Sequence, residues 1–325
     1  YDMNGRIINK LTLMESGEHV HFSPGKKYIL IEKWITEAIE HCPGYNGGDL
    51  YNLEGKKILE IKGHRTRAVS DKGYVIAVDL SSAIPAEPGG NFYVYDSKGT
   101  LLRTIENPAK DKTSPFYAKF SKDGDYALLI FARETATPTI FLLITKEGKI
   151  LWKKEYLEYE YSQWDAEIDI FPYVGIIGGI YKAGENAFYI DWAGNLKWII
   201  RLNTLGYCCC SFDNDTRKIY FSSSSGYLWC FDRATGNLLW KQTISENGKY
   251  ITEMYLDDDN LVLKGAYAGQ VTWHSSQVFI FDTKTGNLKN KAAYPKETFL
   301  TLHNGIIFII NATNNKIEGL KIEEE

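Results

Sequence analysis

The chain has few of the residues that mark disulfide-rich, membrane-spanning or metal-dependent proteins. Its 325 residues contain five cysteines, six histidines and three methionines. An odd number of irregularly spaced cysteines gives no disulfide framework, and no uninterrupted apolar run is long enough for a transmembrane helix. A P-loop, a G-x-S-x-G elbow and an HExxH pair are also absent. These gaps argue against the common nucleotide-binding, serine-hydrolase and zinc-protease classes.

The charge of the chain favours no polyanionic partner. The net charge is −4 at pH 7, so we expect neither a nucleic acid nor an anionic membrane as partner.

The cellular compartment stays open. Unpaired cysteines favour the cytoplasm, but the first residue is Tyr1 rather than Met, which leaves room for a signal, an anchor or a preceding domain and thus for a periplasmic or extracellular location. Two N-x-T sequons, at Asn214 and Asn311, would be glycosylated only in a secretory pathway.

Helical periodicity is nearly absent, whereas aromatic residues are plentiful. Aromatic side chains make up 14% of the chain, with 22 tyrosines and eight tryptophans, and they favour half-buried sheet surfaces. Only residues 32–41 have a helical spacing, which we interpret as a turn within a loop. The composition therefore predicts an all-β protein.

The segment FDRATGNLLWKQ, residues 231–242, predicts a tight β-hairpin. The carboxylate of Asp232 can accept hydrogen bonds from the amides of the turn and from the Thr235 hydroxyl, and Gly236 can adopt a positive φ without a steric clash. The preceding residues, GYLWCF, are typical of a buried strand. The following residues alternate, with Leu238 and Trp240 on one face.

The same hairpin recurs along the whole chain. Related turns are YDMNG, YNLEG, YDSKG, ITKEG, IDWAG and FDTKTG, and the seven glycines are Gly5, Gly55, Gly99, Gly148, Gly194, Gly236 and Gly286. The residue two positions after the glycine is apolar in six of the seven copies, and the residue four positions after it is Trp152, Trp198 or Trp240 in three consecutive copies. A period of about 40 to 50 residues with several short strands in each unit predicts the blades of a β-propeller.

The number of strands predicts seven four-stranded blades in a closed ring. Six complete units lie between residues 19 and 292, three strands remain at residues 298–303, 305–311 and 316–322, and a single strand at residues 6–11 precedes the first unit. Pairing of residues 6–11 with residues 316–322 would complete the seventh blade and leave no exposed sheet edge. We therefore interpret residues 1–325 as one domain. One apolar position on each innermost strand is expected to pack blade against blade, namely Phe22, Val69, Phe120, Phe171, Phe212, Leu256 and Leu302.

Residues 230–240, CFDRATGNLLW, resemble the A-x-D-x-x-T-G-x-x-x-W repeat of the pyrroloquinoline-quinone (PQQ)-like, or quinoprotein-like, propellers. The segments HFSPGKKYILI and KFSKDGDYALLIF are also distantly similar to the inner strands of WD-repeat propellers. In that second group a Gly-His opens most blades and a Trp-Asp closes them, whereas here Gly63-His64 occurs once and no Trp-Asp closes a blade. The PQQ-like resemblance implies a propeller fold for the whole chain.

The quinone dehydrogenases of the PQQ-like group are eight-bladed and bind calcium or a similar ion beside the quinone. Several of them stack a disulfide between adjacent cysteines on the cofactor. The chain has an adjacent set, Cys208, Cys209 and Cys210, but it has one predicted blade fewer and no recognisable set of Glu, Asn and Asp metal ligands. We therefore expect neither a cofactor nor a metal, and interpret the three cysteines as small buried residues that begin an inner strand.

Histidines and carboxylates give no convergent catalytic or metal site. His19 and His21 are expected on one inner strand, and His64 and His303 fall in the blades on either side. We interpret these histidines as hydrogen-bonding groups of the channel rather than as metal ligands. Paired carboxylates for glycoside hydrolysis could be assembled from several loops, but no spacing forces two of them together.

One face of the predicted ring carries the longer loops. Connections between the second and third strands of a blade, and connections between blades, lie on the same face, and here they span residues 35–48, 81–91, 106–115, 155–167 and 265–276. The opposite face has short turns such as SPGK, DKG, KDG and KEG. The longer-looped face is therefore the predicted binding face.

Aromatic and acidic residues of this face form the predicted binding site. The segment EYLEYEYSQWDAE contains Tyr159, Tyr161 and Trp164, which could stack on a sugar or a cation, and Asp165, which would attract positive charge together with the neighbouring glutamates. The alternative is a solvated loop whose rings pack on their own blade. Three further residues are expected on the same face and could anchor a partner protein, namely Trp34, Trp273 and His274.

A strong scaffold pattern without a catalytic signature favours a non-enzymatic binding protein. We expect a rigid ring that presents its loop-rich face to a protein partner, as a domain or subunit of a larger assembly. Two alternatives stay open. The chain could bind carbohydrate through residues 155–167, or it could be an enzyme, either a quinone-dependent oxidoreductase or a carbohydrate-active enzyme, with its site at the mouth of the central channel.

Overall fold

The structure is a computed structural model in which most of the described residues form β-strands. The described residues are 20–25, 27–35, 44–79, 90–108, 114–132, 139–156, 166–180, 186–202, 211–214, 217–222, 226–244, 249–257, 259–268, 273–295, 298–303, 306–311 and 316–321. They contain no helix, which confirms the predicted all-β class. A helix long and apolar enough to cross a membrane is accordingly not found in this part of the chain.

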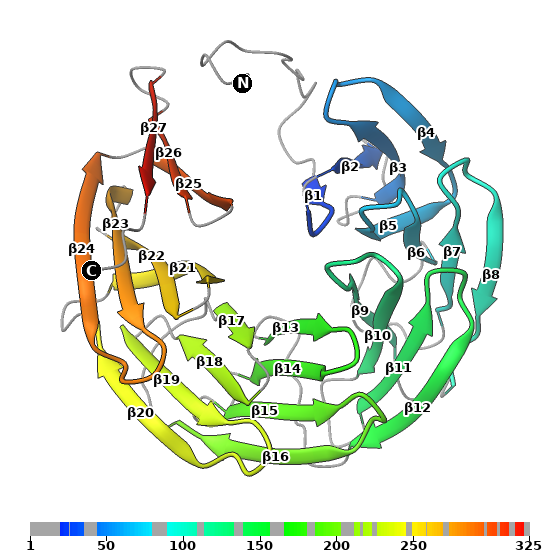
Figure 1. Cartoon of the computed structure of the whole chain (residues 1–325). Coiled ribbons are helices and arrows are strands. Elements are labelled where there is room, and N and C mark those ends of the chain that lie inside the picture. The colour runs from blue at the N-terminus through cyan, green and yellow to red at the C-terminus, as the bar shows by residue number, and fades with distance from the viewer. Residues whose placement is uncertain are drawn as a thin grey trace. The chain divides into compact units, whose positions relative to one another are not determined.

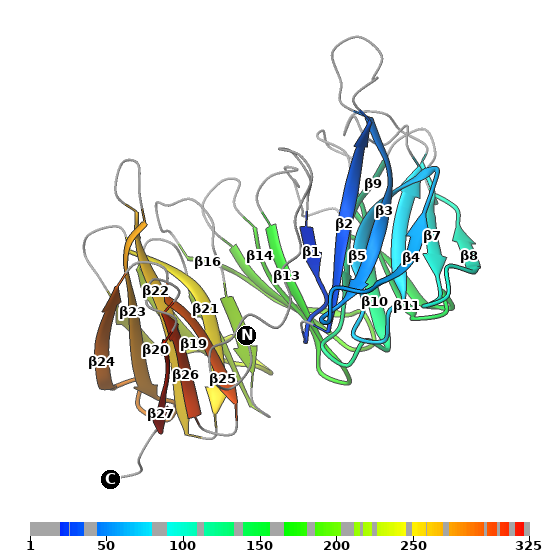
Figure 2. The same ribbon diagram turned by 90° about the horizontal axis from the view of Figure 1, so that it is seen from above.

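The strands form meanders in which each strand pairs with its neighbours in the sequence (Figures 1 and 2). In the described residues there are six four-stranded sheets and one three-stranded sheet. Consecutive strands pair in the antiparallel sense. Each four-stranded sheet therefore has the strand order predicted for one repeat.

Sheets 1 to 3 follow one another in the first half of the chain. Sheet 1 consists of β1 (Val20–Phe22), β2 (Tyr28–Ile35), β3 (Gly44–Asn52) and β4 (Lys57–Ile61). Sheet 2 consists of β5 (His64–Val69), β6 (Val75–Asp79), β7 (Phe92–Tyr95) and β8 (Leu101–Ile105). Sheet 3 consists of β9 (Ser114–Phe120), β10 (Tyr126–Ala132), β11 (Thr139–Thr145) and β12 (Ile150–Tyr156).

Sheets 4 to 7 occupy the second half. Sheet 4 consists of β13 (Ala166–Phe171), β14 (Gly175–Ile180), β15 (Asn186–Asp191) and β16 (Leu196–Arg201). Sheet 5 consists of β17 (Ser211–Asn214), β18 (Lys218–Ser222), β19 (Tyr227–Asp232) and β20 (Leu238–Thr243). Sheet 6 consists of β21 (Lys249–Asp257), β22 (Asn260–Ala268), β23 (Trp273–Asp282) and β24 (Leu288–Pro295). Sheet 7 consists of β25 (Thr298–His303), β26 (Ile306–Asn311) and β27 (Lys316–Lys321).

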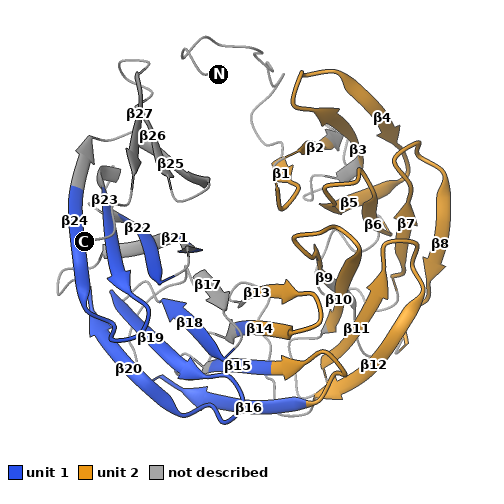
Figure 3. Cartoon of the chain, viewed as in Figure 1, with its two compact units in different colours: residues 1–8, 178–189, 196–325 blue, residues 9–177, 190–195 orange. Residues whose placement is uncertain are grey.

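The chain divides into two compact units (Figure 3). One, the N-terminal unit, comprises residues 9–177 and 190–195, and the other, the C-terminal unit, comprises residues 1–8, 178–189 and 196–325. The division passes through sheet 4, so sheets 1 to 3 belong to the N-terminal unit and sheets 5 to 7 to the C-terminal unit.

Within each unit the hydrophobic core lies between the faces of neighbouring sheets. In the N-terminal unit one buried cluster joins sheets 1 and 2 and another joins sheets 2 and 3, where the rings of Phe92 and Phe131 meet edge-to-face at 5.0 Å. In the C-terminal unit a cluster around Tyr220 and Phe279 joins sheets 5 and 6. The third strand β11 is almost entirely buried, whereas the outer strand β8 is exposed along most of its length. This stacking explains the near-continuous apolar runs of the central strands.

The hairpin between β19 and β20 forms as predicted. The amide and the hydroxyl of Thr235 each donate a hydrogen bond of 2.8 Å to Oδ1 of Asp232, and Gly236 has a φ of 74°. The hairpin of sheet 6 repeats this geometry around Asp282 and Gly286. In both hairpins the pairing register shifts by one residue next to the turn, as expected for a bulge that accompanies a left-handed glycine.

Each hairpin glycine also lies against the preceding sheet. A β-carbon placed on Gly236 would lie 2.7 Å from Cγ of Trp198, and one placed on Gly286 would lie 2.7 Å from Cδ2 of Trp240. These tryptophans are the residues four positions after the glycine of the previous copy. Only glycine allows the turn to approach the indole ring this closely.

The tryptophans also donate a hydrogen bond to the turn that they support. The bonds run from the indole Nε1 to a backbone carbonyl oxygen, from Trp152 to Trp192 at 2.9 Å, from Trp198 to Arg233 at 3.0 Å and from Trp240 to Thr283 at 3.3 Å. We call the contacts Trp152–Gly194, Trp198–Gly236 and Trp240–Gly286 the tryptophan joints. Where the tryptophan is missing, Leu59 lies under Gly99 and Arg103 under Gly148, and we call these two the aliphatic joints. Every joint thus fixes one sheet to the next.

The short turns after the first strands of sheets 1, 2 and 3 are each held by a buried serine. Oγ of Ser23 accepts hydrogen bonds from the amides of Lys27 and Tyr28, at 2.9 and 3.1 Å. Ser70 and Ser121 accept equivalent bonds in sheets 2 and 3.

The structure corrects several predicted boundaries. Residues 32–35, which have a helical spacing, form the end of β2. The predicted loop 35–48 ends earlier because β3 begins at Gly44, and most of the predicted loop 265–276 belongs to β22 and β23. In the two predicted loops, backbone pairing continues through glycine and polar residues that need no apolar neighbour.

The predicted closing strand, residues 6–11, lies outside the described residues. Its predicted partner, residues 316–322, is present as β27, the last strand of the three-stranded sheet 7. Closure of the ring therefore stays a prediction.

Candidate functional site

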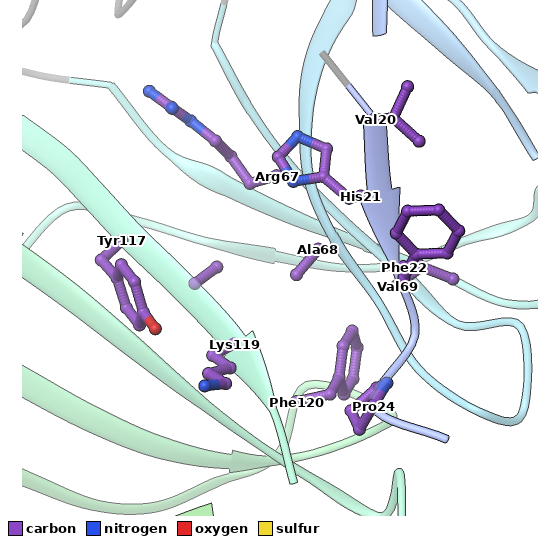
Figure 4. Close-up of a pocket in the computed structure, with 11 residues that line it drawn as sticks. Val20, His21, Phe22, Pro24, Arg67, Ala68, Val69, Tyr117, Lys119 and Phe120 are labelled. Carbon is purple, nitrogen blue, oxygen red and sulfur yellow. The ribbon is translucent and has the colours of Figure 1, made fainter. Parts of the chain in front are cut away.

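A cavity of about 410 Å³ opens on the first strands of the N-terminal unit (Figure 4). Its walls come from β1, β5 and β9 and from the turn that follows β1. These are equivalent strands of three consecutive sheets, so the repeat itself brings them together. We call this cavity the inner-strand pocket.

One part of the inner-strand pocket is polar. His21 of β1 and Arg67 of β5 contribute to it, while Tyr117 and Lys119 project from β9 (Figure 4). The remaining lining is apolar and includes Val20, Phe22, Val69 and Phe120. A concave site with a few polar groups set in an apolar wall is typical of ligand pockets.

A buried carboxylate next to the pocket is neutralised within the protein. Glu32 of β2 is fully buried, and its Oε1 lies 3.2 Å from Nε2 of His21. Its other oxygen lies 3.5 Å from Nε of Arg65. Because a buried charge must be matched by opposite charge or hydrogen bonds, these two partners explain why Glu32 is tolerated there.

A second cavity, of about 170 Å³, shares lining residues with the inner-strand pocket. Pro24, Lys119 and Phe120 contribute to both, and the second cavity adds Lys122 and Asp169. Lys119 forms an ion pair with Asp169. Among the described lining residues, the charged groups of the two cavities are Arg67, Lys119, Lys122 and Asp169.

The expectation that one apolar residue of each inner strand packs between blades is partly wrong. Val69, Phe120 and Phe171 are buried as predicted, and Leu256 packs against the core cluster of sheets 5 and 6. Phe22 is 58% exposed, because its ring lines the inner-strand pocket instead of a neighbouring sheet. The side chains of Phe212 and Leu302 lie outside the described residues.

An aromatic cluster lies at the short turns of sheets 3 and 4. Tyr173 has a φ of 62° and is 75% exposed. Its hydroxyl lies 3.1 Å from that of Tyr126, and the ring of Trp192 lies 4.8 Å from that of Tyr126. The hydrogen bond to Tyr173 raises the pKa of Tyr126 to about 12. A non-glycine residue in the left-handed region costs on the order of 1 kcal/mol, and these contacts hold it in place.

His21 and His64 are both hydrogen-bonded, as the sequence predicted for inner-strand histidines. Nδ1 of His64 lies 2.6 Å from the hydroxyl of Tyr95, and its ring stacks on Tyr93 at 3.7 Å. Burial lowers the pKa of His64, because the charged form loses solvation. In the described residues no three His, Cys, Asp or Glu side chains converge on a common point that could hold a metal ion. His19 lies outside the described part of the chain, and His303 is described only as a residue of β25.

The side chains of the predicted binding residues of the longer-looped face lie outside the described part of the structure. Tyr159, Tyr161, Trp164 and Asp165 lie outside the described residues, as do Cys208, Cys209 and Cys210. Trp34 belongs to β2, and Trp273 and His274 begin β23, but their side chains are not among those described. The proposed role of these seven binding residues therefore stays a prediction. Cys230, which is described, is buried in β19.

The sequence analysis noticed His21 but missed Arg67, Tyr117 and Lys119. The sequence does contain a pattern that indicates these residues. The first strands of sheets 1, 2 and 3 contain HVH, RTR and YAK, with polar or aromatic residues at every second position. Side chains two positions apart point to the same face of a strand. The alternation is short in each strand, however, and becomes informative only when the three repeats are aligned.

No family model and no curated protein sequence matches the chain. Among solved structures, BamB from Moraxella catarrhalis is similar with a TM-score of 0.55 and 13% identity, over 90% of this chain and 88% of that chain. A protein of unknown function from Bacteroides caccae has a TM-score of 0.45 and 14% identity, over 77% of this chain and 91% of its own. The computationally designed Ika8 protein has a TM-score of 0.47 and 14% identity, over 93% of this chain and 95% of that chain. The likeness to BamB supports a β-propeller fold, whereas similarity to WD repeats is not shown.

Proposed function

We propose that the chain is a single seven-bladed propeller that acts as a non-enzymatic scaffold for a protein partner. In the closed ring that we propose, residues 6–11 pair with β27 and complete the seventh blade. The fold likeness to BamB supports the propeller, and the tryptophan joints support a rigid framework. Rigid frameworks of this kind present binding residues on their connections.

The observation that carries this proposal is the contrast between the two ends of the sheets. At one end, the turns of sheets 1 to 3 are short and closed by buried serines or by hairpin glycines. At the other end, the strands are joined by longer segments, among them residues 36–43, 80–91, 106–113 and 157–165. A scaffold that is regular at one end and elaborated at the other favours recognition at the elaborated end.

We propose that aromatic residues of the elaborated end anchor the partner. Tyr and Trp combine a large apolar surface with a hydrogen-bonding group, which is why they are frequent in protein interfaces. Acidic residues next to them would favour a partner with a basic patch. The proposed contact residues are Trp34, Tyr159, Tyr161, Trp164, Asp165, Trp273 and His274.

Cross-linking followed by mass spectrometry tests the proposal in the organism that produces the protein. We expect the full chain to capture one specific partner, and we expect Tyr161→Ala together with Trp164→Ala to lose it. Lys98→Ala, an exposed residue of the β7–β8 turn at the opposite end, is the matched control and should keep the partner. Capture that is unaffected by the aromatic double variant would overturn the assignment of this face.

Two further measurements distinguish the alternative functions. Incubation with PQQ and calcium followed by dialysis tests the oxidoreductase, since a quinone absorbance that stays with the protein would replace the scaffold proposal. A glycan array probed with the wild type and with Trp164→Ala tests carbohydrate recognition. A signal that depends on Trp164 would assign the elaborated end to sugars instead of a protein.

A further inference from the structure

We infer that the cluster of Tyr126, Tyr173 and Trp192 binds a proline-rich segment of a partner protein in the polyproline II conformation. All three residues belong to the N-terminal unit. Tyr126 begins β10, Tyr173 lies in the β13–β14 turn and Trp192 lies in the β15–β16 hairpin. We call them the aromatic turn cluster. The cluster lies at the short turns of sheets 3 and 4, whereas the proposed partner face uses the longer connections, so this is a second contact site.

Tyr173 occupies a backbone position that normally takes glycine. The amide of Val174 donates a hydrogen bond of 3.0 Å to the carbonyl of Phe171, so Pro172 and Tyr173 are the central residues of a β-turn. Proline followed by a residue with a positive φ, here 62°, is typical of a type II turn, in which glycine usually has the positive φ. Tyr173 is 75% exposed. Backbone strain that presents an exposed aromatic ring indicates a binding role.

The cluster is rigid before any ligand arrives. The ring of Tyr126 is nearly perpendicular to those of Trp192 and Tyr173, at 4.8 and 6.1 Å between centroids, with angles of 84° and 82°. The rings of Tyr173 and Trp192 are inclined by 42° to each other at 5.7 Å. The hairpin that carries Trp192 is fixed by a tryptophan joint, because the Trp192 carbonyl accepts the bond from Trp152. A preformed surface loses little entropy on binding.

The cluster can donate hydrogen bonds to a ligand. In the described part of the chain, the indole N–H of Trp192 makes no hydrogen bond. The hydroxyls of Tyr126 and Tyr173 lie 3.1 Å apart, so one donates to the other and the second keeps a proton for a ligand. Rings that combine an apolar face with such a polar group are enriched at protein interfaces.

The carboxylates near the cluster are already engaged within the protein, so they are poorly placed to accept further hydrogen bonds from a ligand. These contacts join Asp123 to the Ser121 hydroxyl and the Asp125 amide, Asp125 to Lys72 and Lys146, and Asp191 to the amide and the side chain of Asn195. The site therefore suits a ligand that accepts hydrogen bonds better than one that must donate them.

A proline-rich segment has this complementary chemistry. Proline has no backbone N–H, so the segment offers carbonyl acceptors and few donors. In the polyproline II conformation these carbonyls make no internal hydrogen bonds, and the conformation already exists in the free peptide. Aromatic-lined surfaces bind such segments in several protein classes. A sugar fits less well, because its hydroxyl groups need acceptors as well as donors.

Ligand-observed NMR titration with the full chain tests the inference. The probe is a capped octaproline. A capped octapeptide of alternating glycine and alanine is the flexible peptide control, and cellohexaose is the probe for sugar binding. We expect octaproline to bind in a saturable manner, and the glycine–alanine peptide to bind at least about tenfold more weakly.

Variants of Trp192 and Tyr126 test the contact residues. Trp192→Ala should weaken octaproline binding about tenfold, as for an aromatic anchor. Tyr126→Phe should weaken it about threefold, because one hydroxyl is lost. The matched control is Tyr74→Phe, since the amides of Tyr74 and Tyr126 are held by the equivalent turn serines of sheets 2 and 3. This control should leave binding unchanged.

Tyr173→Gly separates binding from folding. Glycine adopts a positive φ without strain, so this variant removes the ring and keeps a favourable turn. We expect octaproline binding to fall at least about tenfold, while the midpoint of urea unfolding stays at the wild-type value or rises. Retained binding together with a lower midpoint would assign Tyr173 to folding alone and overturn the inference.

The remaining outcomes also decide the question. Failure of octaproline to bind, equal binding of the two peptides, or equal weakening by Tyr74→Phe and Tyr126→Phe would each overturn the inference. Binding of cellohexaose that depends on Trp192, without binding of octaproline, would assign the cluster to sugars instead. None of these results bears on the proposed partner face, which is tested by its own variants.

Discussion

The tryptophan joints and the aliphatic joints place the same backbone turn on different side chains. A β-carbon on Gly236 would lie 2.7 Å from the Trp198 ring, whereas the nearest atom to a β-carbon on Gly99 is 3.9 Å away, on Leu59. Both glycines have a positive φ, of 74° and 83°. Glycine at 99 is therefore required by the backbone alone, and glycine at 236 by the backbone and by the ring beneath it.

The difference shows that one sequence position can be required for two separable reasons. The left-handed backbone is shared by the six copies of the hairpin that the structure describes, whereas contact with an indole occurs, among these copies, at the three tryptophan joints. Indole packing adds a hydrogen bond to the carbonyl of the turn, which Leu59 cannot make because it has no donor. The tryptophan joints should consequently be stiffer than the aliphatic ones.

Replacement of the two glycines by alanine separates these two reasons and should have the largest effect. We expect Gly236→Ala to lower the free energy of unfolding by about 2–4 kcal/mol, from backbone strain plus overpacking against Trp198. Gly99→Ala should lose only about 1–2 kcal/mol, from the backbone. Urea denaturation followed by tryptophan fluorescence and circular dichroism measures both. Equal losses at the two sites would mean that the ring contact has no energetic role.

Conversion of a tryptophan joint into an aliphatic one should have the next largest effect. We expect Trp198→Leu to cost about 2–3 kcal/mol, because it removes apolar contact and the hydrogen bond to Arg233. In the Trp198→Leu background, Gly236→Ala should cost no more than Gly99→Ala, since the ring is gone. The double-mutant cycle reports this coupling, and additive losses would contradict it.

Removal of a turn carboxylate should cost less and should cost about the same in both kinds of joint. The Thr285 amide is the main cause that lowers the pKa of Asp282 to about 2, and hydrogen bonds from the turn also lower the pKa of Asp96. Asp282→Asn should lose about 1 kcal/mol at neutral pH, and Asp96→Asn should be destabilising to a similar extent. If one loss is much larger, the turns differ as well as the joints.

The pH dependence of Asp282 follows from the direction of its shift. Because its pKa is lowered on folding, its contribution is complete above the ordinary carboxyl pKa of about 4. It is lost as the pH falls from there to about 2. Acid titration of stability should therefore show a shallower decline in Asp282→Asn than in the wild type over this interval.

The β13–β14 turn shows a third way to support a turn residue with a positive φ. A change there should have the smallest effect on stability. Here a tyrosine rather than a glycine has a positive φ, supported by aromatic neighbours. Tyr173→Phe removes the hydroxyl contact, so the pKa of Tyr126 should fall from about 12 towards its ordinary value of 10. Ultraviolet titration of tyrosine ionisation measures this shift. An unchanged titration would show that the hydrogen bond to Tyr173 is not its cause.

The sign of that shift also fixes where stability changes. The folded-state pKa of Tyr126 is raised above its unfolded value, so its contribution is complete below about pH 10. It disappears as the pH rises from there to about 12. The stability advantage of the wild type over Tyr173→Phe should therefore be constant below about pH 10 and should shrink over this interval.

Local features of the fold could be predicted from the sequence, and contacts between repeats could not. Asp232 and Gly236 act within one short turn, so their residue types and spacing were enough to predict the hairpin. Trp198 was recognised as a recurring residue, but its partner Gly236 belongs to the next copy. Periodicity shows that a contact recurs and does not show which copy it faces.

The candidate pocket was predictable only in part for the same reason. His21 drew attention because histidine is rare in the chain. Arg67 and Lys119 are common surface residue types, and each looks ordinary within its own strand. Their shared cavity arises from the alignment of three repeats, which no single stretch of sequence contains.

The offset of the joints bears on how such a chain can change in length. Each joint connects the outer strand of one repeat to the hairpin of the next. The glycine of a copy thus belongs to the joint with the preceding copy, and the tryptophan of that copy belongs to the joint with the following copy. A deletion or insertion that ends between this glycine and this tryptophan therefore removes or adds one half of each of the two joints. Excision or duplication of a whole period, from one tryptophan to the next, leaves each remaining indole with a glycine above it. The chain can thus gain or lose whole repeats by gene duplication or deletion, because the joint at the new junction uses the same residue types as the existing joints.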